Sequence, residues 1–565
     1  MAIPKLQQIK YISHFLKPKE KFIIKILWSI ILFSFIFLAL RFYFVHLQLL
    51  PAKGGEYTEG LVGSPKFVNP VLASANEVDL DISQLIFSGL LRYDENQKLI
   101  PDLATDYQLS ADQKTYTFSL KKNIKWHDGE SLNADDIVFT IETIQNPEYK
   151  SPLYSSFKGV KCEKIDENQV KFILNEPYSP FPSLLTVGIL PKHIWQEIGP
   201  SQFHLAEYNL KPIGTGPYQF KSLIKDKKGT IKNYVLKRND NFYRTPAFLD
   251  KFTFKFYNDY NEVLDAFRNK LINGVGVVEG ILEEINLKNF NRHLLVLPQY
   301  TAIFFNQSNN PFLKEKKVRQ ALSYAIDREK IIKEVLGDDG AIINGPILEG
   351  NIGYDSNIKK YQLDLNKANQ LLDEAGWKLE TSTTTQSSIR KNGKDEFKIV
   401  LTTLDKEENR KTAEAIKKDW EKLGIFTDLQ FIPSQVVIKD VIKPKNYQAL
   451  LYGVMVGPEA DPYLLWHSSQ ASESGLNLSN FSNKTVDQDL EDARKTSDTK
   501  IKEQKYQDFQ NIISEEVPAI FLYSPFYNYL MDNKIKGFNL KNISLPPERF
   551  NTIEGWYIKT RRGLK

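Results

Sequence analysis

Residues 116–144 read YTFSLKKNIKWHDGESLNADDIVFTIETI, and this stretch holds a strand, a turn and a helix start in immediate succession. Large and small side chains alternate from Tyr116 to Leu120, as they do along a half-buried strand. The Asp-Gly pair at residues 128–129 is a signal for a tight turn. Asn133 then precedes a helical pattern with acidic residues in its first turn, where they suit the positive end of the helix dipole. This order is typical of a mixed α/β fold.

The second half of the chain continues to alternate strands and helices. Helical patterns cover residues 318–332 and 364–376, each with its apolar residues on one face. Residues 396–432 then follow the order strand, amphipathic helix, strand, which favours a mixed or parallel sheet. The polar residues 378–394 interrupt the pattern, and we expect them to form a loop insertion without a function.

The composition is that of a folded protein with more than one domain. A chain of 565 residues exceeds what one compact core usually holds and is typical of two or three domains. Apolar residues make up 42% and charged residues 25%, which excludes an intrinsically disordered chain. Because 74 basic and 69 acidic residues nearly cancel, to a net charge of +5, nothing indicates a nucleic-acid surface.

An apolar segment near the N-terminus, Phe22–Val45, is predicted to cross a membrane as one helix. About 20 helical residues span a bilayer core of ~30 Å, and the run from Ile26 to Leu40 carries no charge. Five lysines and one glutamate precede the segment, and the density of positive charge falls after it. The positive-inside rule therefore places residues 1–21 in the cytoplasm and residues 46–565 in a periplasmic or extracellular space.

A cleaved signal peptide is the alternative interpretation of this segment. Such a peptide has a shorter apolar region, followed by small residues at the cleavage site. Here the sequence RFYFVHLQLL follows at residues 41–50, and no cysteine is available for a lipid anchor. We therefore expect an uncleaved single-pass anchor, followed by a linker at residues 46–60.

The sequence lacks the signatures of common enzyme classes. It contains neither a G-x-x-x-x-G-K-[ST] phosphate loop nor a G-x-S-x-G nucleophile turn. Penicillin-binding proteins share an anchored architecture, but their K-[ST]-G motif is missing. The seven histidines lack metal-ligand spacing, and Cys162 fits a small buried apolar residue. We therefore predict a protein that is not an enzyme and holds neither a cofactor nor a metal.

A series of short blocks after residue 58 resembles the family 5 extracellular solute-binding proteins, the oligopeptide and dipeptide receptors of ABC importers. The most specific block combines Trp126-His-Asp-Gly129 with Asp135-Asp-Ile-Val-Phe139. Each block alone is weak evidence, whereas the shared order is strong. The other blocks are Asn69-Pro70, Ile86–Tyr93, Leu99–Ala104, Tyr116–Phe118, Gly214–Tyr218, Phe305-Asn306, Val318–Asp327, Asp461-Pro462 and Pro518–Phe521.

The resemblance implies a type II periplasmic-binding-protein fold, α/β in class, in which two lobes close over a ligand by a hinge motion. The chain would cross between the lobes near residues 300 and 522. The ATPase and the permease must be separate chains, and the receptor is expected to be a monomer. The implied parts are the anchor 22–45, the linker 46–60, a first lobe of residues 61–300 and 523–565 with an extra third domain inserted at about 93–205, and a second lobe of residues 301–522.

The sequence GPEADP at residues 457–462 is the best candidate for contact with the ammonium group of a peptide, because a buried cation needs an acidic partner. Peptide-binding relatives carry an aspartate four residues before Pro462, where this chain has Pro458. Glu459 is the candidate replacement, and it either contacts the ligand or is a solvated loop acid. Asp461 either contacts the ligand or caps the following helix.

Three further residues are candidates for the ligand cleft. Asn306 follows a predicted strand, and its amide either pairs with a peptide backbone or caps a turn. Trp466 and Tyr523 either line pockets for ligand side chains or belong to the core.

The residues and the resemblance together predict a membrane-anchored receptor that captures peptides and delivers them to an ABC import permease. A nonpeptide solute such as a metal chelate, haem or a sugar is the alternative ligand, and His467 is the one histidine near the acidic loop. A role as a cell-surface sensor is a second alternative, and a penicillin-binding-type enzyme is a distant one.

Overall fold

The computed structural model describes residues 17–277, 289–381, 388–457, 461–472 and 475–564. The chain divides into two compact units. One comprises Met1–Gly55 with Tyr557–Lys565, and the other comprises Glu56–Trp556.

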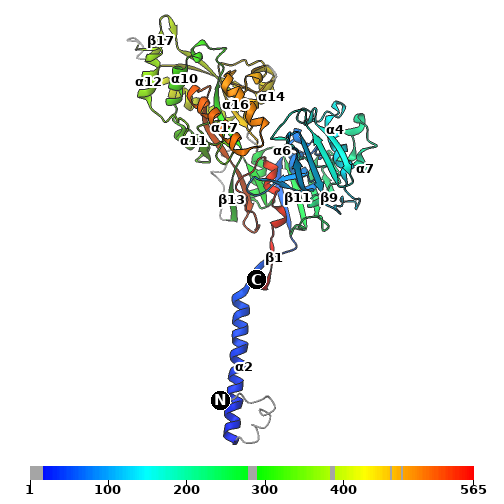
Figure 1. Cartoon of the computed structure of the whole chain (residues 1–565). Helices are drawn as coiled ribbons and strands as arrows, with labels where there is room; N and C mark the ends of the chain where they lie inside the picture. Colours follow the sequence, from blue (N-terminus) through cyan, green and yellow to red (C-terminus); the bar gives the residue numbers. More distant parts are fainter. Residues whose placement is uncertain (1–16, 278–288, 382–387, 458–460, 473–474, 565) are drawn as a thin grey trace. The chain divides into compact units, whose positions relative to one another are not determined.

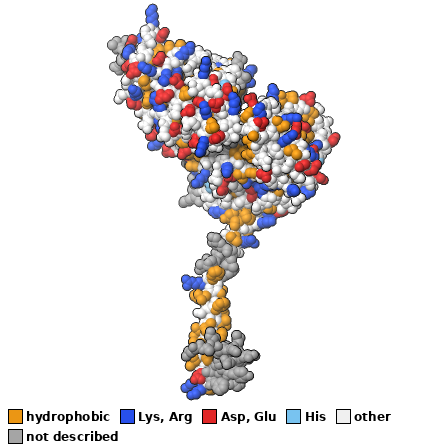
Figure 2. Space-filling view, viewed as in Figure 1, with side chains coloured by type: hydrophobic (Ala, Val, Ile, Leu, Met, Phe, Trp, Pro, Cys, Tyr) orange, Lys and Arg blue, Asp and Glu red, His pale blue; other side chains and the backbone are white. Residues whose placement is uncertain are grey.

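The smaller unit joins an apolar helix to a two-stranded ribbon. Helix α2 (Pro18–His46) is long and apolar enough to cross a membrane, and most of its large apolar side chains from Phe22 to Phe42 are exposed (Figures 1 and 2). Strand β1 (Leu47–Ala52) follows at once and pairs antiparallel with β23 (Lys559–Leu564). Part of the expected linker is therefore a strand, because its hydrogen-bonding partner comes from the far end of the chain.

The larger unit is organised around a twelve-stranded sheet that runs through both lobes. The main path follows the order β20-β19-β21-β14-β22-β12-β2-β11-β10-β9, and β13 and β15 also pair with β22. The strands of the first lobe are β2 (Glu56–Val62), β9 (Tyr218–Lys225), β10 (Ile231–Arg238), β11 (Lys251–Tyr257), β12 (Gly274–Val277) and β13 (Phe290–Val296), with helices α3 (Glu77–Ile86) and α9 (Tyr260–Arg268).

Strand β22 (Ala519–Asp532) belongs to both lobes. Its first residues pair with β14 (Gln299–Phe305), and residues 526–532 pair with β13. Residues 300 and 522, near which we expected the crossings, lie in β14 and β22, and the crossings themselves stay a prediction. Because β22 is one continuous strand, the lobes share a backbone connection that can bend but cannot separate.

The inserted segment of the first lobe confirms the strand, turn and helix expected for residues 116–144. The sequence forms β6 (Thr115–Leu120), a turn with Gly129 at φ +97°, and helix α4 (Ala134–Gln145), which begins with a capping box of Asn133 and Asp136. The other elements here are β3 (Leu91–Tyr93), β4 (Leu99–Pro101), β5 (Ala104–Leu109), β7 (Lys161–Asp166), β8 (Gln169–Ile173), α5 (Tyr154–Phe157), α6 (Phe181–Leu184), α7 (Lys192–Trp195) and α8 (Pro200–Phe203).

The second lobe has the predicted parallel arrangement. Strands β19 (Lys398–Leu404) and β20 (Phe426–Ile432) are parallel and joined by helix α13 (Glu407–Glu421). Figure 1 shows the helices of this lobe, among them α10, α12, α16 and α17, around the sheet. The remaining elements are β15 (Gly340–Ile342), β16 (Lys378–Thr381), β17 (Ser388–Asn392), β18 (Asp395–Glu396), β21 (Ala449–Met455), α10 (Lys316–Tyr324), α11 (Arg328–Leu336), α12 (Leu365–Glu374), α14 (Ser434–Val437), α15 (Tyr463–Trp466), α16 (Lys484–Lys495) and α17 (Thr499–Glu516).

Two expectations for the second lobe need correction. The predicted helix over residues 318–332 is broken into α10 and α11, because the Asp327 carboxylate accepts a hydrogen bond from the Lys330 N–H and starts a new helix. The expected polar loop at residues 378–394 contains the antiparallel pair β16 and β17. Its Arg390 is buried, and the guanidinium donates to the carbonyls of Trp377 and Leu423.

A buried ionic cluster joins four segments of the first lobe. The Arg549 guanidinium donates to both oxygens of Asp81 at 2.6 and 2.8 Å and to one oxygen of Glu59 at 3.0 and 3.1 Å. The other oxygen of Glu59 accepts from the hydroxyls of Tyr57 and Tyr529 at 2.8 and 3.0 Å. Burial lowers the pKa of Arg549, but the charges around it, Asp81 first, outweigh burial and hold the pKa well above its usual value.

Replacing Arg549 with alanine is expected to destabilise the protein by about 3–5 kcal/mol, because the carboxylates of Glu59 and Asp81 would remain buried without a cation. Urea unfolding of the full chain measures the change. The matched control is Lys211→Ala, which removes an exposed ion pair with Glu207 and is expected to cost less than about 1 kcal/mol. Equal losses for the two variants would contradict the assignment.

His127, in the most specific sequence block, connects two blocks of the first lobe. Its Nδ1 accepts a hydrogen bond from the Gly214 N–H at 3.2 Å, so Nε2 carries the proton and donates to the Gly216 carbonyl at 3.1 Å. Burial lowers the pKa of His127 to about 4. The neutral ring therefore has a structural role, as a tie between the turn at residues 126–129 and the loop at 214–218.

The His127 tie is expected to make stability depend on pH. Between pH 6.5 and about 4 the unfolded chain binds a proton that the folded chain does not, so stability falls as the pH drops through this window. The loss amounts to about 3 kcal/mol at most. The variant His127→Gln should be less stable at pH 7 and show a shallower slope between pH 4 and 6.5. A His204→Gln control should keep the slope of the original chain, and parallel curves for all three proteins would refute the role of His127.

Candidate functional site

The acidic loop predicted to bind a ligand follows β21, which pairs antiparallel with β14 in the second lobe. Glu459 and Pro458 lie outside the described residues, so the structure leaves the predicted contact of Glu459 with a ligand as a prediction. Gly457, at φ +71°, turns the chain away from the strand. Asp461 is the first described residue beyond the gap and leads into α15.

Asp461 is engaged by two partners in the protein. One carboxylate oxygen accepts a hydrogen bond from the Tyr463 N–H at 3.1 Å, which fixes the start of α15. The other accepts from Arg494 Nε at 2.7 Å. The Arg494 guanidinium also lies 3.9 Å from the centre of the Tyr463 ring. In this arrangement the charge of Asp461 is already balanced by Arg494.

Arg494 also takes part in contacts between the second lobe and the inserted domain. Its guanidinium lies 5.1 Å from the Tyr178 ring, and its carbonyl accepts from the Ser179 N–H at 3.0 Å. Nearby, Lys502 Nζ donates to Ser179 Oγ at 3.1 Å. A further hydrogen bond joins the Ser497 N–H to the side chain of Gln113 at 2.7 Å. No local sequence pattern indicates this contact, because its members are hundreds of residues apart.

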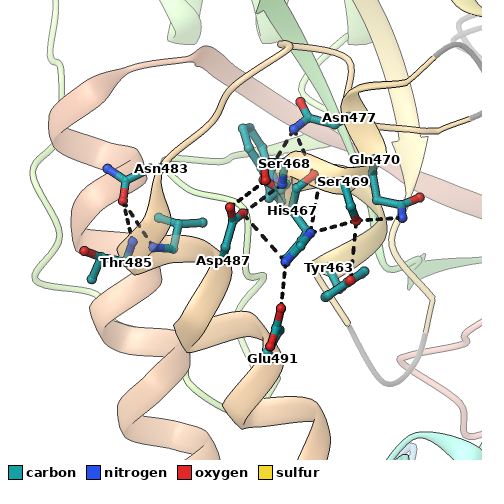
Figure 3. Close-up of polar contacts among 12 residues, drawn as sticks. Tyr463, His467, Ser468, Ser469, Gln470, Asn477, Asn483, Thr485, Asp487 and Glu491 are labelled. Atoms are coloured by element: carbon teal, nitrogen blue, oxygen red, sulfur yellow. Dashed lines mark hydrogen bonds and ion pairs between the residues drawn. The ribbon is translucent and has the colours of Figure 1, made fainter.

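His467 is the centre of a polar cluster beside this contact (Figure 3). Its ring stacks on Tyr463 at 4.1 Å, and Nδ1 accepts from the Ser469 N–H at 3.1 Å. Nε2 faces two acids of α16, with Glu491 at 3.4 Å and Asp487 at 3.9 Å. These contacts attach the loop that follows α15 to helix α16. Among the described residues, no group of three or more His, Cys, Asp or Glu side chains is placed to hold a metal ion.

Asn306 is fully buried, and protein groups occupy its amide. Its Nδ2 donates to the Lys445 carbonyl at 2.9 Å, and its Oδ1 accepts from the Ser308 N–H and from Asn480 Nδ2, both at 3.1 Å. Of the two roles considered for Asn306, pairing with a ligand backbone or capping a turn, these hydrogen bonds correspond to the capping of a turn. A ligand backbone could reach the amide only if these hydrogen bonds were exchanged.

Trp466 and Tyr523 lie in the core of the second lobe. Trp466 packs against Phe304, Phe509 and Phe521, and only 1% of it is exposed. The Tyr523 hydroxyl donates to Glu408 at 3.0 Å, and burial, together with the charge of Glu408, raises its pKa well above the usual value. In this conformation the two aromatic side chains stabilise the lobe, and their predicted contact with a ligand stays a prediction.

A cavity of about 290 Å³ lies within the first lobe and was not predicted from the sequence. Its volume is close to the lower end of the usual range for small-molecule sites, ~300 Å³. Its walls come from residues within 70–93, 153–157, 183–188 and 545–553, together with Asp102, Pro217 and Arg244. Gly89 is a local sequence feature of this wall, because a Cβ at this position would lie 2.6 Å from the Thr186 carbonyl oxygen and would prevent the close packing of the two segments.

The cavity wall is mainly apolar, with a few charged groups. Arg92, Asp102 and Arg244 lie together on one side, and Glu548 lies among the residues of the C-terminal segment. Burial raises the pKa of Glu548 to about 7, and its carboxyl accepts from the Ser544 N–H at 2.7 Å. A solute with an apolar body and a polar end suits this lining.

Comparisons with known proteins agree with this geometry. The family model for bacterial extracellular solute-binding proteins, family 5 Middle, matches residues 98–475. The oligopeptide-binding protein AppA of Bacillus subtilis is 30% identical over 520 residues, which cover 90% of this chain and 92% of the relative. The dipeptide-binding protein of Escherichia coli is 28% identical over 491 residues, covering 81% and 87%.

Solved structures show the same fold. The Bacillus subtilis AppA complex with a nonapeptide superposes with a TM-score of 0.70 at 28% identity and covers 90% of this chain and all of that one. NikZ of Campylobacter jejuni, in complex with Ni(L-His), gives a TM-score of 0.71 at 28% identity and covers 89% and 99%. The resemblance seen in the sequence blocks is therefore confirmed, and the chain belongs to family 5 of the bacterial extracellular solute-binding proteins.

Proposed function

We propose that this protein is a membrane-anchored receptor that captures peptides outside the cytoplasm and delivers them to an ABC import permease on separate chains. The observation that carries the peptide assignment is the similarity, over 90% of the chain, to an oligopeptide-binding protein whose structure holds a nonapeptide. The receptor is a monomer in this proposal and releases its ligand chemically unchanged.

The contacts between the lobes support a closing motion as the means of capture. Tyr178, Ser179 and Gln113 of the inserted domain meet Arg494, Ser497 and Lys502 of the second lobe through three hydrogen bonds and one cation–π contact. Such contacts are individually weak. They therefore favour the closed arrangement without preventing the opening that ligand entry requires.

Helix α2 supports the anchor. Most of its large apolar side chains between Phe22 and Leu40 are exposed, and a bilayer would cover them. Lys17, Lys19 and Lys21 precede the apolar run, which favours a cytoplasmic N-terminus and places the solute-binding lobes on the other side.

A nonpeptide solute is the second candidate ligand. The structurally similar NikZ of Campylobacter jejuni was solved in complex with Ni(L-His), so a protein with this fold holds a metal chelate. His467 of this chain, however, already stacks on Tyr463 and faces Glu491. That engagement favours the peptide.

Thermal unfolding of the purified full chain in detergent tests the ligand class. Pools of short peptides are expected to raise the melting temperature, because a ligand at about 100 times its Kd adds about 2.7 kcal/mol to the stability of the folded state. Ni(L-His), haem and simple sugars serve as comparison ligands. If one of these raises the melting temperature while every peptide pool leaves it unchanged, the peptide proposal is wrong.

Glu459 is proposed to receive the ammonium group of the peptide, because Asp461 is neutralised by Arg494. Acetylating the peptide amine should then weaken binding to the original chain by about 10-fold or more. The variant Glu459→Gln should bind free and acetylated peptides with similar Kd values, as measured by calorimetry. The control Glu503→Gln changes an exposed acid on α17 and should keep the preference for the free amine. A Glu459→Gln variant that keeps this preference would assign the ammonium to another group.

A further inference from the structure

The ribbon of β1 and β23 concentrates positive charge next to the apolar helix. Lys53, Lys559, Arg561 and Arg562 are all exposed. Among the described residues, none of these four side chains forms an ion pair with an acid. The sequences of residues 22–55 and 557–565 contain no aspartate or glutamate, so no acid close in sequence balances this charge.

The register of the ribbon fixes how near these cations lie to the end of the helix. Helix α2 ends at His46 and β1 begins at the next residue, so no flexible spacer separates them. Arg562 pairs with Leu49 and Arg561 with Leu50. Leu49 is three residues past the helix, which is about 10 Å of extended strand. If α2 spans a bilayer, this distance lies within reach of the polar headgroup layer.

The larger unit, Glu56–Trp556, has a net charge of the opposite sign. Residues 1–55 and 557–565 contain 12 basic residues and 1 acidic residue of the 74 and 69 in the chain. Glu56–Trp556 therefore contain 62 basic and 68 acidic residues, a net charge of −6. An anionic membrane surface repels such a body and attracts the ribbon, so the attraction is confined to these few residues.

We propose that the ribbon is a binding surface for the phosphate groups of anionic lipids in the leaflet that faces the solute-binding lobes. The inference rests on the proposed membrane anchor. Arginine suits this task, because its planar guanidinium donates two parallel hydrogen bonds to a phosphate. Neighbouring residues of a strand point to opposite faces, so Arg561 and Arg562 present cations on both sides of the ribbon.

Apolar groups of the ribbon suit the same position. Leu49 is 67% exposed and lies on the face of Arg562, with Pro51 beyond it on the same strand. An exposed leucine beside an arginine matches the boundary between acyl chains and headgroups, where the one is buried and the other meets phosphate. The ribbon would thus hold the C-terminal strand at the membrane as well as the strand that follows the anchor.

Native mass spectrometry of the full chain tests the proposal. The protein is released from detergent micelles that contain equal amounts of phosphatidylglycerol and phosphatidylcholine, and the bound lipids are counted. The original chain is expected to retain phosphatidylglycerol preferentially. The double variant Arg561→Gln, Arg562→Gln should lose about 10-fold or more of that preference, since each cation near a membrane contributes about 5-fold.

Two matched variants separate charge from side-chain shape and from total charge. Arg561→Lys with Arg562→Lys keeps both charges and should retain most of the preference. Lys227→Gln with Lys228→Gln removes two exposed cations from the turn between β9 and β10 and should leave the preference unchanged. Equal retention of the two lipids by the original chain, or an unchanged preference in the arginine-to-glutamine variant, would overturn the proposal.

A different experiment shows whether the proposed membrane anchor itself is wrong. If the full chain does not float with liposomes and is extracted by alkaline carbonate, α2 does not span the bilayer, and both proposals are wrong. If the chain stays in the membrane but shows no preference for phosphatidylglycerol, only the lipid surface is wrong. Peptide binding, followed by the melting temperature, is expected to be the same in the original chain and the ribbon variants.

Discussion

The buried pairing of Arg549 with Asp81 and Glu59 is the interaction on which the first lobe depends. It joins residues from β2, α3 and the C-terminal segment, and through the hydroxyls of Tyr57 and Tyr529 it includes β22. Burying three charges is costly unless each has a partner, and here nearly every hydrogen-bonding position is filled. The cluster therefore fixes how the last segment of the chain packs on the strand that begins the lobe.

That fixation matters because β22 serves both lobes. One end of the strand is held by the ionic cluster through Tyr529, and the other end pairs with β14 in the second lobe. A bend between the two ends changes the distance between the lobes without breaking either attachment. Such a bend would change the contacts of Arg494, because Arg494 pairs with Asp461 in one lobe and lies over the ring of Tyr178 in the other.

The candidate residues of the second lobe and the cavity of the first lobe differ in their surroundings. Asn306 follows β14, Trp466 lies in α15 and Tyr523 lies within β22, and each is occupied by contacts within the protein. The cavity of the first lobe, by contrast, is bounded by residues of α3, β3 and α6 and by the C-terminal residues 545–553.

Much of the fold was accessible from the sequence because the signals are local. The strand, turn and capping box of residues 115–145 depend on neighbours in the chain, and so does the strand–helix–strand unit around α13. Local patterns failed where a single side chain decided the matter: Asp327 starts a second helix, and Arg390 is buried within a segment whose polarity suggested a loop.

The candidate site was less accessible for the same reason. The acidic loop was visible as a motif, but neither Arg494, which neutralises Asp461, nor the walls of the cavity could be located, since each depends on residues far apart in the chain. The sequence by itself determined the apolar helix, the α/β class and the family, which follow from composition, periodicity and ordered blocks. Only the tertiary structure decided that the C-terminal strand returns to pair beside the apolar helix and that Arg549 meets two acids, because long-range pairing leaves no local trace in the chain.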